Sequence, residues 1–174
     1  MTLEELWALF PIVLTEHRDC WKEYFSEEAE ALKAVLPSGA VISHIGSTAI
    51  KDIYAKPIVD ILVEVGGDLR AISEIIQNAG YIKTSENATR VSFNKGYTEN
   101  GFAEKVYHLH LRLFGDNDEI YFRDYLNAHP KVAAEYETLK LFLCKKFEHD
   151  RDGYTLAKTE FVQKYTAIAK SNYN

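Results

Sequence analysis

The sequence predicts an α+β, or mixed α/β, fold in which helices pack on a small sheet. Strand patterns cluster between residues 40 and 115, helical patterns occur before and among them, and only helical patterns follow Gly115. This order is typical of helices layered on one sheet, with a helical C-terminal part. At 174 residues, the chain is expected to form a single domain, residues 1–174, with a sizeable core.

Two helices are expected before the first strand. The opening TLEELWALF places Thr2 and Glu5 at the spacing of a capping box, and Pro11 marks the end of this short helix. From Cys20 onward, apolar residues recur every three or four positions, which indicates a helix lying on a core. The segment LPSG ends this second helix.

Two strands are expected next, on either side of the turn GST (46–48). AVISHI (40–45) has the β-branched character of a strand. KPIVDILVEV (56–65) is almost apolar on both faces, which is typical of a central strand.

The middle of the chain predicts a helix and two more strands. GGDLRAISEIIQNAGY indicates a helix between two glycine signals, with Asp68 as its N-cap. A strand is expected in TRVSFNKG (89–96), and a loop over residues 97–104. KVYHLHLRLF (105–114) alternates strictly and gives the clearest strand signal of the chain.

Helices are expected throughout the segment after Gly115. Pro130 suits the first turn of a helix whose apolar residues share one face. Gly153 is expected to separate this helix from a last one, which ends near Lys170.

Composition limits the possible partners and locations. The chain carries 20 Lys and Arg against 26 Asp and Glu, a net charge of −6, which disfavours bulk nucleic-acid binding but not a local basic site. Cys20 and Cys144 lack metal-ligand spacing, and no apolar run approaches the ~18 residues of a membrane span. We therefore expect a soluble cytoplasmic protein without membrane association, and the oligomeric state stays open.

Gly46 and Ser47, followed by Asp60, form the pattern with the most chemical content. A glycine lets backbone N–H groups approach a phosphate closely, and hydroxyls at Ser47 and Thr48 could add contacts. A carboxylate on the neighbouring strand could hold Mg²⁺ against a triphosphate. The alternative is a structural turn beside a strand carboxylate. P-loop, Rossmann, α/β-hydrolase and zincin motifs are absent.

A longer set of segments resembles the GrpB family, which is generally placed in the nucleotidyltransferase superfamily. The segments occur in the family's order over roughly residues 17–170 and include WKEYF, HIGSTAI, AKPIVDILVEV, RVSFNKG, HLHL, FRDYLNAHP and YTLAKTEFV. The resemblance implies a nucleotidyltransferase fold, a small mixed sheet flanked by helices. It also implies that Gly46 and Ser47 line a phosphate site and that Asp60 lies on the next strand, but it does not identify an activity. In the leading hypothesis, Asp60 and Ser47 are catalytic, Asp60 holds Mg²⁺ or Mn²⁺, and the substrate is a nucleoside triphosphate.

The sequence departs from the superfamily at the second acidic position. Active nucleotidyltransferases usually carry an acidic residue two positions after the first, and Leu62 stands there. Glu64 is a poor substitute, because residues four apart on a strand lie about 13 Å apart, and it is expected to be a solvated strand-end glutamate.

Further metal ligands would have to come from another strand. His108 and His110 alternate onto one face of their strand, with Arg112 beside them. If this strand neighbours that of Asp60, one Asp and two His could bind a cation, and imidazole favours a transition metal. The alternatives are histidines that act as acid, base or phosphate donors, and histidines with ordinary structural hydrogen bonds.

Several basic residues are candidates for contacting the phosphates. Lys56 precedes the Asp60 strand, and Arg90 and Lys95 belong to RVSFNKG. The nucleotide-binding candidates are thus Gly46, Ser47, Thr48, Lys56, Arg90, Lys95 and Arg112, with Arg123 as a further cation. Lys140 and Lys158 match family positions, but the sequence does not distinguish binding from surface roles for them.

Three functional hypotheses follow. The first is a nucleotide- and metal-binding protein that transfers a nucleotidyl group to an unknown acceptor. The second, motivated by Leu62, is a non-catalytic nucleotide or metal sensor or adaptor. The third is a transition-metal enzyme that uses the His108/His110 face.

Overall fold

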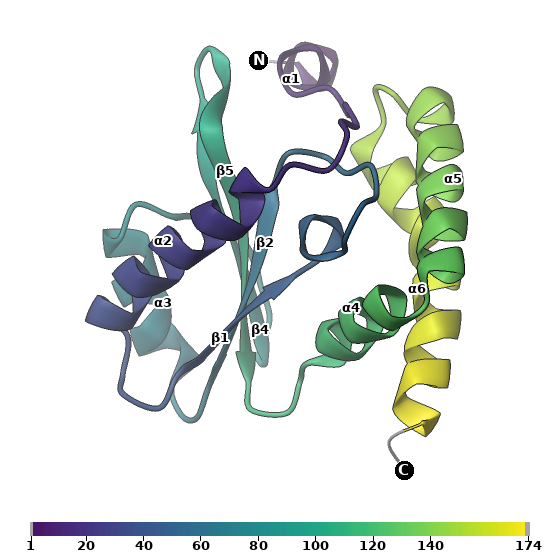
Figure 1. Cartoon of the computed structure of the whole chain (residues 1–174). Helices are drawn as coiled ribbons and strands as arrows, with labels where there is room; N and C mark the ends of the chain where they lie inside the picture. Colours follow the sequence, from purple (N-terminus) through teal and green to yellow (C-terminus); the bar gives the residue numbers. More distant parts are fainter. Residues whose placement is uncertain (1, 173–174) are drawn as a thin grey trace.

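The computed structural model describes residues 2–172, which form one five-stranded sheet covered by helices (Figure 1). The strand order is β1-β2-β5-β4-β3. Strands β2 and β5 run parallel, and the other neighbouring pairs run antiparallel. The strands span β1 Val41–Ile45, β2 Val59–Val65, β3 Ile82–Glu86, β4 Arg90–Thr98 and β5 Gly101–Leu113. The sheet is therefore mixed, with the apolar strand β2 beside the alternating strand β5.

The helices divide between the two faces of the sheet (Figure 1). Helices α2 (Cys20–Val35) and α3 (Leu69–Asn78) lie on one face, and α4 (Asp118–Ala128), α5 (Pro130–Lys146) and α6 (Arg151–Ser171) lie on the other side. The short helix α1 (Leu3–Leu9) has the expected capping box of Thr2 and Glu5. Asp68 caps α3 by accepting from the Arg70 N–H group.

Side-chain alternation gives the sheet one apolar face and one partly polar face. The apolar face presents residues such as Ile61, Phe93 and Leu109 to α2 and α3, and these form the main core. On the other face, Asp60 stands directly beside His108, its register partner across the parallel pair. The alternation in KVYHLHLRLF therefore places both histidines on the side of the C-terminal helices.

The C-terminal helices form a second apolar cluster, which packs against the segment that follows β1 and the short 3₁₀ helix η1 (Ser47–Ala49). Phe122, Leu126, Ala133 and Tyr136 pack with Ile50 and Ile53, which follow η1. Helix α6 contacts both α4 and α5. This packing fixes three helices against the loop that carries Gly46 and Ser47.

The structure corrects the sequence prediction in three places. Residues 97–104 are not a loop, because β4 continues to Thr98 and β5 begins at Gly101, which makes a hairpin. Gly96 permits the bulge in this hairpin, since its φ is 96° and an added Cβ would overlap the carbonyl oxygen of Lys105. Strand β3 was not predicted, since its IKTSE sequence is polar and largely exposed. Gly153 lies within α6, whose N-cap is Asp150.

Among the described residues, no helix is long and apolar enough to cross a membrane.

Candidate functional site

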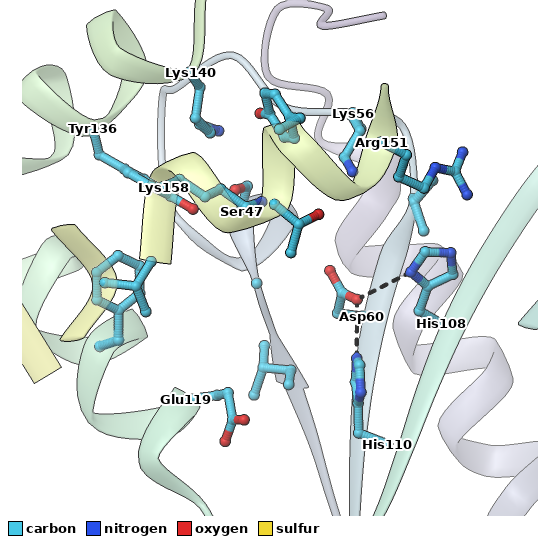
Figure 2. Close-up of a pocket in the computed structure, with 17 residues that line it drawn as sticks. Ser47, Lys56, Asp60, His108, His110, Glu119, Tyr136, Lys140, Arg151 and Lys158 are labelled. Carbon is cyan, nitrogen blue, oxygen red and sulfur yellow. Dashed lines mark hydrogen bonds and ion pairs between the residues drawn. The ribbon is translucent and has the colours of Figure 1, made fainter. Parts of the chain in front are cut away.

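A cavity of about 380 Å³ opens between the polar face of the sheet and the C-terminal helices. Its walls come from the end of β1 and η1, from β2 and β5, and from α4, α5 and α6. Figure 2 shows Asp60, His108 and His110 on the sheet side, with Lys140 and Lys158 projecting from the helices opposite. The cavity therefore combines residues from both halves of the chain.

Asp60 lies on the floor of the cavity and contacts both histidines of β5. Its Oδ1 atom is 3.3 Å from Nε2 of His110 and 3.7 Å from Nδ1 of His108 (Figure 2). Burial opposes ionisation of the carboxyl group, but the hydrogen bond from His110 and electrostatic attraction to the neighbouring basic side chains His108, His110 and Lys56 bring the Asp60 pKa below its usual value. Asp60 is therefore an anion at neutral pH.

Gly46 is required beside this carboxylate for two reasons. Its φ of 76° lies in the region that favours glycine, and an added Cβ would overlap Oδ2 of Asp60. The next residue, Ser47, lines the cavity. Thr48 does not line it and is 3% exposed, with its hydroxyl 2.9 Å from Nε2 of His44. Of the turn residues, Gly46 and Ser47 are thus the two placed to contact a ligand.

His108 is linked through a tyrosine to the start of α6. Its Nε2 atom is 2.7 Å from the Tyr97 hydroxyl, which accepts a hydrogen bond of 2.8 Å from Nη1 of Arg151. Because that hydroxyl accepts from Arg151, its own proton is available to His108. Burial is the main cause that lowers the pKa of His108 to about 4, so its imidazole is neutral at pH 7.

Three lysines and one arginine face the cavity without an acidic partner within ion-pair distance among residues 2–172 (Figure 2). They are Lys56 before β2, Lys140 of α5, and Arg151 and Lys158 of α6. Lys56 and Lys158 both lie over the Tyr154 ring, with Nζ 5.1 and 4.8 Å from its centroid. This concentration of positive charge is unusual in a protein whose net charge is −6.

Two of these lysines have strongly lowered pKa values. Burial, followed by repulsion from Lys158 and Arg151, lowers the pKa of Lys56 to about 7. Burial and repulsion from Lys158 likewise lower the pKa of Lys140 to about 7. Lys140 is 1% exposed and donates to the backbone carbonyl oxygen of Tyr54. A polyanion in the cavity would relieve this repulsion.

The other predicted cations lie outside the cavity and pair with acidic residues. Arg90 forms a bidentate ion pair with Asp116. Lys95 forms an ion pair with Glu28 on the opposite face of the sheet. Arg112 is 7% exposed and pairs with Asp116 and Glu119. Arg123 donates to the backbone oxygen of His44. The structure therefore does not bring these arginines or Lys95 to the cavity.

The two positions after Asp60 on the same face are buried and contribute no second carboxylate to the cavity. Leu62 is 0% exposed. Glu64 is 4% exposed, and its Oε1 accepts hydrogen bonds of 3.0 Å from Gly115 N–H and Asn117 Nδ2. The expectation that Glu64 is solvated was wrong, because its carboxylate caps the segment that leads into α4.

The histidines and Asp60 do not form a ready three-residue metal site. Both ring nitrogens point to the same oxygen, Oδ1 of Asp60, rather than surrounding a common point. Within residues 2–172, no group of three His, Cys, Asp or Glu side chains is arranged to hold an ion. Asp60 could hold a divalent cation through its one carboxylate only if most of the other ligands came from a bound molecule or from water.

Three polar cavity residues with unpaired side-chain atoms are not among the candidates that the sequence predicts. Arg151, Tyr154 and Glu119 lie in helical segments where charged and aromatic residues are common, and no local pattern sets them apart. Each has a buried side-chain atom without a hydrogen-bond partner in the described structure: Nη2 of Arg151, the Tyr154 hydroxyl and Oε2 of Glu119. Unpaired buried polar atoms are rare and call for an explanation such as an absent ligand.

Comparisons with known proteins show the family of the chain. The family described as GrpB protein matches residues 11–167. A "Glutamate-rich protein GrpB" of Alkalihalophilus pseudofirmus is 39% identical over 160 residues, which cover 87% of this chain and 91% of that protein. The "UPF0157 protein YqkA" of Bacillus subtilis is 34% identical over 88% of this chain, which spans only 46% of that relative.

Solved structures agree on the fold. The crystal structure of the conserved protein GrpB from Enterococcus faecalis superposes with a TM-score of 0.79 at 30% identity, covering 92% of this chain and 99% of that one. The Cid1 poly(U) polymerase, solved with Mg 3′-dATP bound, matches with a TM-score of 0.51 at 14% identity, covering 89% of this chain and 51% of its own. The second likeness shows the fold alone, and together the findings establish that this chain is a member of the GrpB family with a nucleotidyltransferase-like fold.

Proposed function

We propose that this protein binds a nucleoside triphosphate with a divalent cation in the cavity and transfers its nucleotidyl group to an acceptor. The observation that carries the proposal is the unpaired cationic group Lys56, Lys140, Arg151 and Lys158, which faces Asp60 across the cavity. Once all four are protonated, these basic side chains, which have no acidic partner among residues 2–172, match the charge of a triphosphate. The fold is shared with the Cid1 polymerase, which was solved with Mg 3′-dATP bound and thus supports the substrate class.

Each wall of the cavity has a part in binding. The lysines and Arg151 bind the β- and γ-phosphates, while Gly46 lets the backbone approach them and Ser47 offers its hydroxyl. Asp60 holds the divalent cation through one carboxylate. When bound, the cation neutralises charge on the phosphate oxygens. The acceptor hydroxyl attacks the α-phosphorus in line and releases its proton to water. The bond between the α-phosphorus and the bridging oxygen to the β-phosphate breaks, and pyrophosphate leaves.

Calorimetry with ATP, GTP, CTP and UTP, each with Mg²⁺ or Mn²⁺, tests the binding proposal. Lys158→Met is expected to weaken triphosphate binding about ten-fold, because it removes a cation that has no acidic partner in the described part of the chain. Lys164→Met is the matched control, since Lys164 is exposed on the same helix and does not line the cavity. Asp60→Asn is expected to abolish the gain in affinity that Mg²⁺ gives the wild type. No binding of any triphosphate to the wild type would refute the proposal.

A non-catalytic nucleotide sensor or adaptor is the second candidate, and the buried Leu62 favours it. With Leu62 in place of a second acidic residue, the strand presents one carboxylate to the cation. Pyrophosphate release in a screen of hydroxyl acceptors separates the two candidates. Tight binding without release across the screen would favour the sensor. The transition-metal hypothesis has less support, because both histidines contact the same oxygen of Asp60.

A further inference from the structure

The three unpaired polar atoms of the cavity differ in chemistry according to where they lie. Nη2 of Arg151 is a donor, and the Tyr154 hydroxyl can donate. Both belong to the cationic part of the cavity, where Lys56 and Lys158 each lie over the Tyr154 ring. Oε2 of Glu119 is an acceptor, and Figure 2 shows Glu119 on the opposite side of Asp60 from Lys56 and Lys140. One part of the cavity therefore offers unpaired hydrogen-bond donors, and the other part offers an unpaired acceptor.

Glu119 is held in place by a network of ion pairs behind the cavity. Its Oε1 atom is 3.0 Å from Nη2 of the buried Arg112. Arg112 also contacts Asp116 at 3.4 Å, and Asp116 is in turn bound by Arg90 at 2.7 and 2.8 Å. These contacts tie the first turns of α4 to strands β4 and β5. They fix one carboxylate oxygen of Glu119 and leave Oε2 without a partner.

A bound phosphate cannot satisfy Oε2 of Glu119, because both groups are anionic acceptors. The penalty of an unpaired buried acceptor is removed by an O–H or N–H donor. One turn further along α4, Phe122 also lines the cavity and gives an apolar surface beside this acceptor. An apolar wall next to a hydrogen-bond acceptor suits the nucleoside part of a nucleotide.

We propose that Glu119 determines ligand specificity by accepting a hydrogen bond from a hydroxyl or amino group of the bound nucleoside. This inference rests on the proposed triphosphate binding. The lysines and Arg151 take the phosphates, Asp60 lies between, and Glu119 recognises a donor on the ribose or the base. The site thereby distinguishes a nucleotide from an inorganic polyphosphate of the same charge.

Binding of Mg-ATP and Mg-tripolyphosphate to Glu119→Gln and to the wild type tests this inference. Glu119→Gln keeps the shape of the side chain and can still accept from Arg112 through its carbonyl oxygen, but it places an amide donor where Oε2 stood. Glu160→Gln removes the same charge from an exposed position of α6 outside the cavity and is the matched control.

We expect Glu119→Gln to weaken ATP binding about ten-fold or more and to leave tripolyphosphate binding unchanged or slightly tighter. Glu160→Gln is expected to change neither. An equal effect of Glu119→Gln on both ligands, or no effect on either, would overturn the inference while leaving triphosphate binding intact. Failure of the wild type to bind tripolyphosphate and all four of ATP, GTP, CTP and UTP would instead overturn the proposed function.

Analogues identify the donor and keep the test decisive if the variant does not fold. 2′,3′-Dideoxy-ATP lacks the ribose hydroxyls, and purine riboside triphosphate lacks the amino group of adenine. We expect one of them to bind the wild type about ten-fold more weakly than ATP. The analogue that does so assigns the contact to the ribose or to the base. Equal binding of ATP and both analogues to the wild type would contradict the inference.

Discussion

At the scale of single residues, the candidate site contains a few side chains whose environments are energetically unfavourable in the free protein. Lys140 is almost fully buried, and the pKa values of Lys56 and Lys140 are lowered to about 7. Gly46 has a positive φ, which other residues rarely adopt, and any side chain at this position would overlap Asp60. Strain and buried charge of this kind are common at functional sites, where they reduce stability.

Gly46→Ala is expected to lower the free energy of unfolding by about 1 to 3 kcal/mol, because it combines a positive φ with overlap of the new Cβ and Oδ2 of Asp60. Urea unfolding measures this change. Gly39→Ala is the control, since an added Cβ at Gly39 has no atom within 4 Å. Equal stability of the two variants would contradict the described packing of Asp60 against the turn.

Lys140→Met is expected to increase stability by on the order of 1 to 2 kcal/mol and to weaken triphosphate binding. Methionine retains the packing of the aliphatic stem without a buried charge, at the cost of the hydrogen bond to the Tyr54 carbonyl. Thermal unfolding and calorimetry measure the two effects. Lys131 is exposed on the same helix, so Lys131→Met is expected to change neither stability nor triphosphate binding. A less stable Lys140→Met protein that binds normally would show that the lysine is structural.

At the scale of secondary-structure elements, the site depends on links between the sheet and the C-terminal helices. The β4–β5 hairpin meets the start of α6 through Tyr97, and β2 meets the segment before α4 through Glu64. Phe10 also packs on Tyr97 and Phe102 of the hairpin. These contacts place Arg151 next to His108, although the two are far apart in sequence.

Tyr97→Phe is expected to lower the free energy of unfolding by about 1 to 2 kcal/mol, because it removes the hydroxyl that connects Arg151 and His108 but keeps the ring. Amide hydrogen exchange is expected to increase at the start of α6. Tyr165→Phe removes an exposed hydroxyl contact with Glu135 and is expected to cost less than 0.5 kcal/mol, about the limit for surface changes. Unchanged exchange at α6 in Tyr97→Phe would contradict this link.

At the scale of the whole molecule, an acidic protein encloses a cationic cavity between two separately packed layers. The net charge of −6 disfavours the approach of large polyanions, while the cationic lining of the cavity would attract a small anion that can enter it. The apolar core between the sheet and helices α2 and α3 packs on the face of the sheet away from the cavity. The apolar cluster of α4, α5 and α6 stabilises the helical side of the cavity. The site lies where these two layers meet.

Triphosphate binding is expected to take up protons near neutral pH. The pKa values of Lys56 and Lys140 are about 7 in the free protein, and a bound polyanion raises them because it favours the charged forms. Affinity is therefore expected to fall as pH rises through 7 toward 9, by about ten-fold per pH unit for each proton fully linked to binding. Calorimetry in buffers of different ionisation enthalpy measures this uptake.

Lys140→Met is expected to reduce the proton uptake and to flatten the pH dependence. Lys131→Met retains both, because Lys131 lies outside the cavity. Binding that strengthens from pH 7 to pH 9 would have the opposite sign and would exclude these lysines from the phosphate site.

The sequence by itself determined the central sheet and the part of the site that lies on adjacent segments. The alternation of HLHLRL and the apolar run around Asp60 predicted two sheet strands and the shared polar face of the two histidines, and both strands are confirmed. Gly46 and Ser47 were identified because a glycine turn beside a strand carboxylate is a local pattern. The polar edge strand β3 gave no such pattern and was missed.

Only the tertiary structure decided which cations face Asp60. Lys140, Arg151 and Lys158 lie 80 or more positions after it, on helices where a lysine facing a cavity and a lysine facing solvent have the same sequence pattern. Arg90, Lys95 and Arg112 were equally reasonable candidates, but packing pairs each of them with a carboxylate elsewhere. Charge pairing is set by the approach of distant elements in three dimensions, and no local periodicity encodes it.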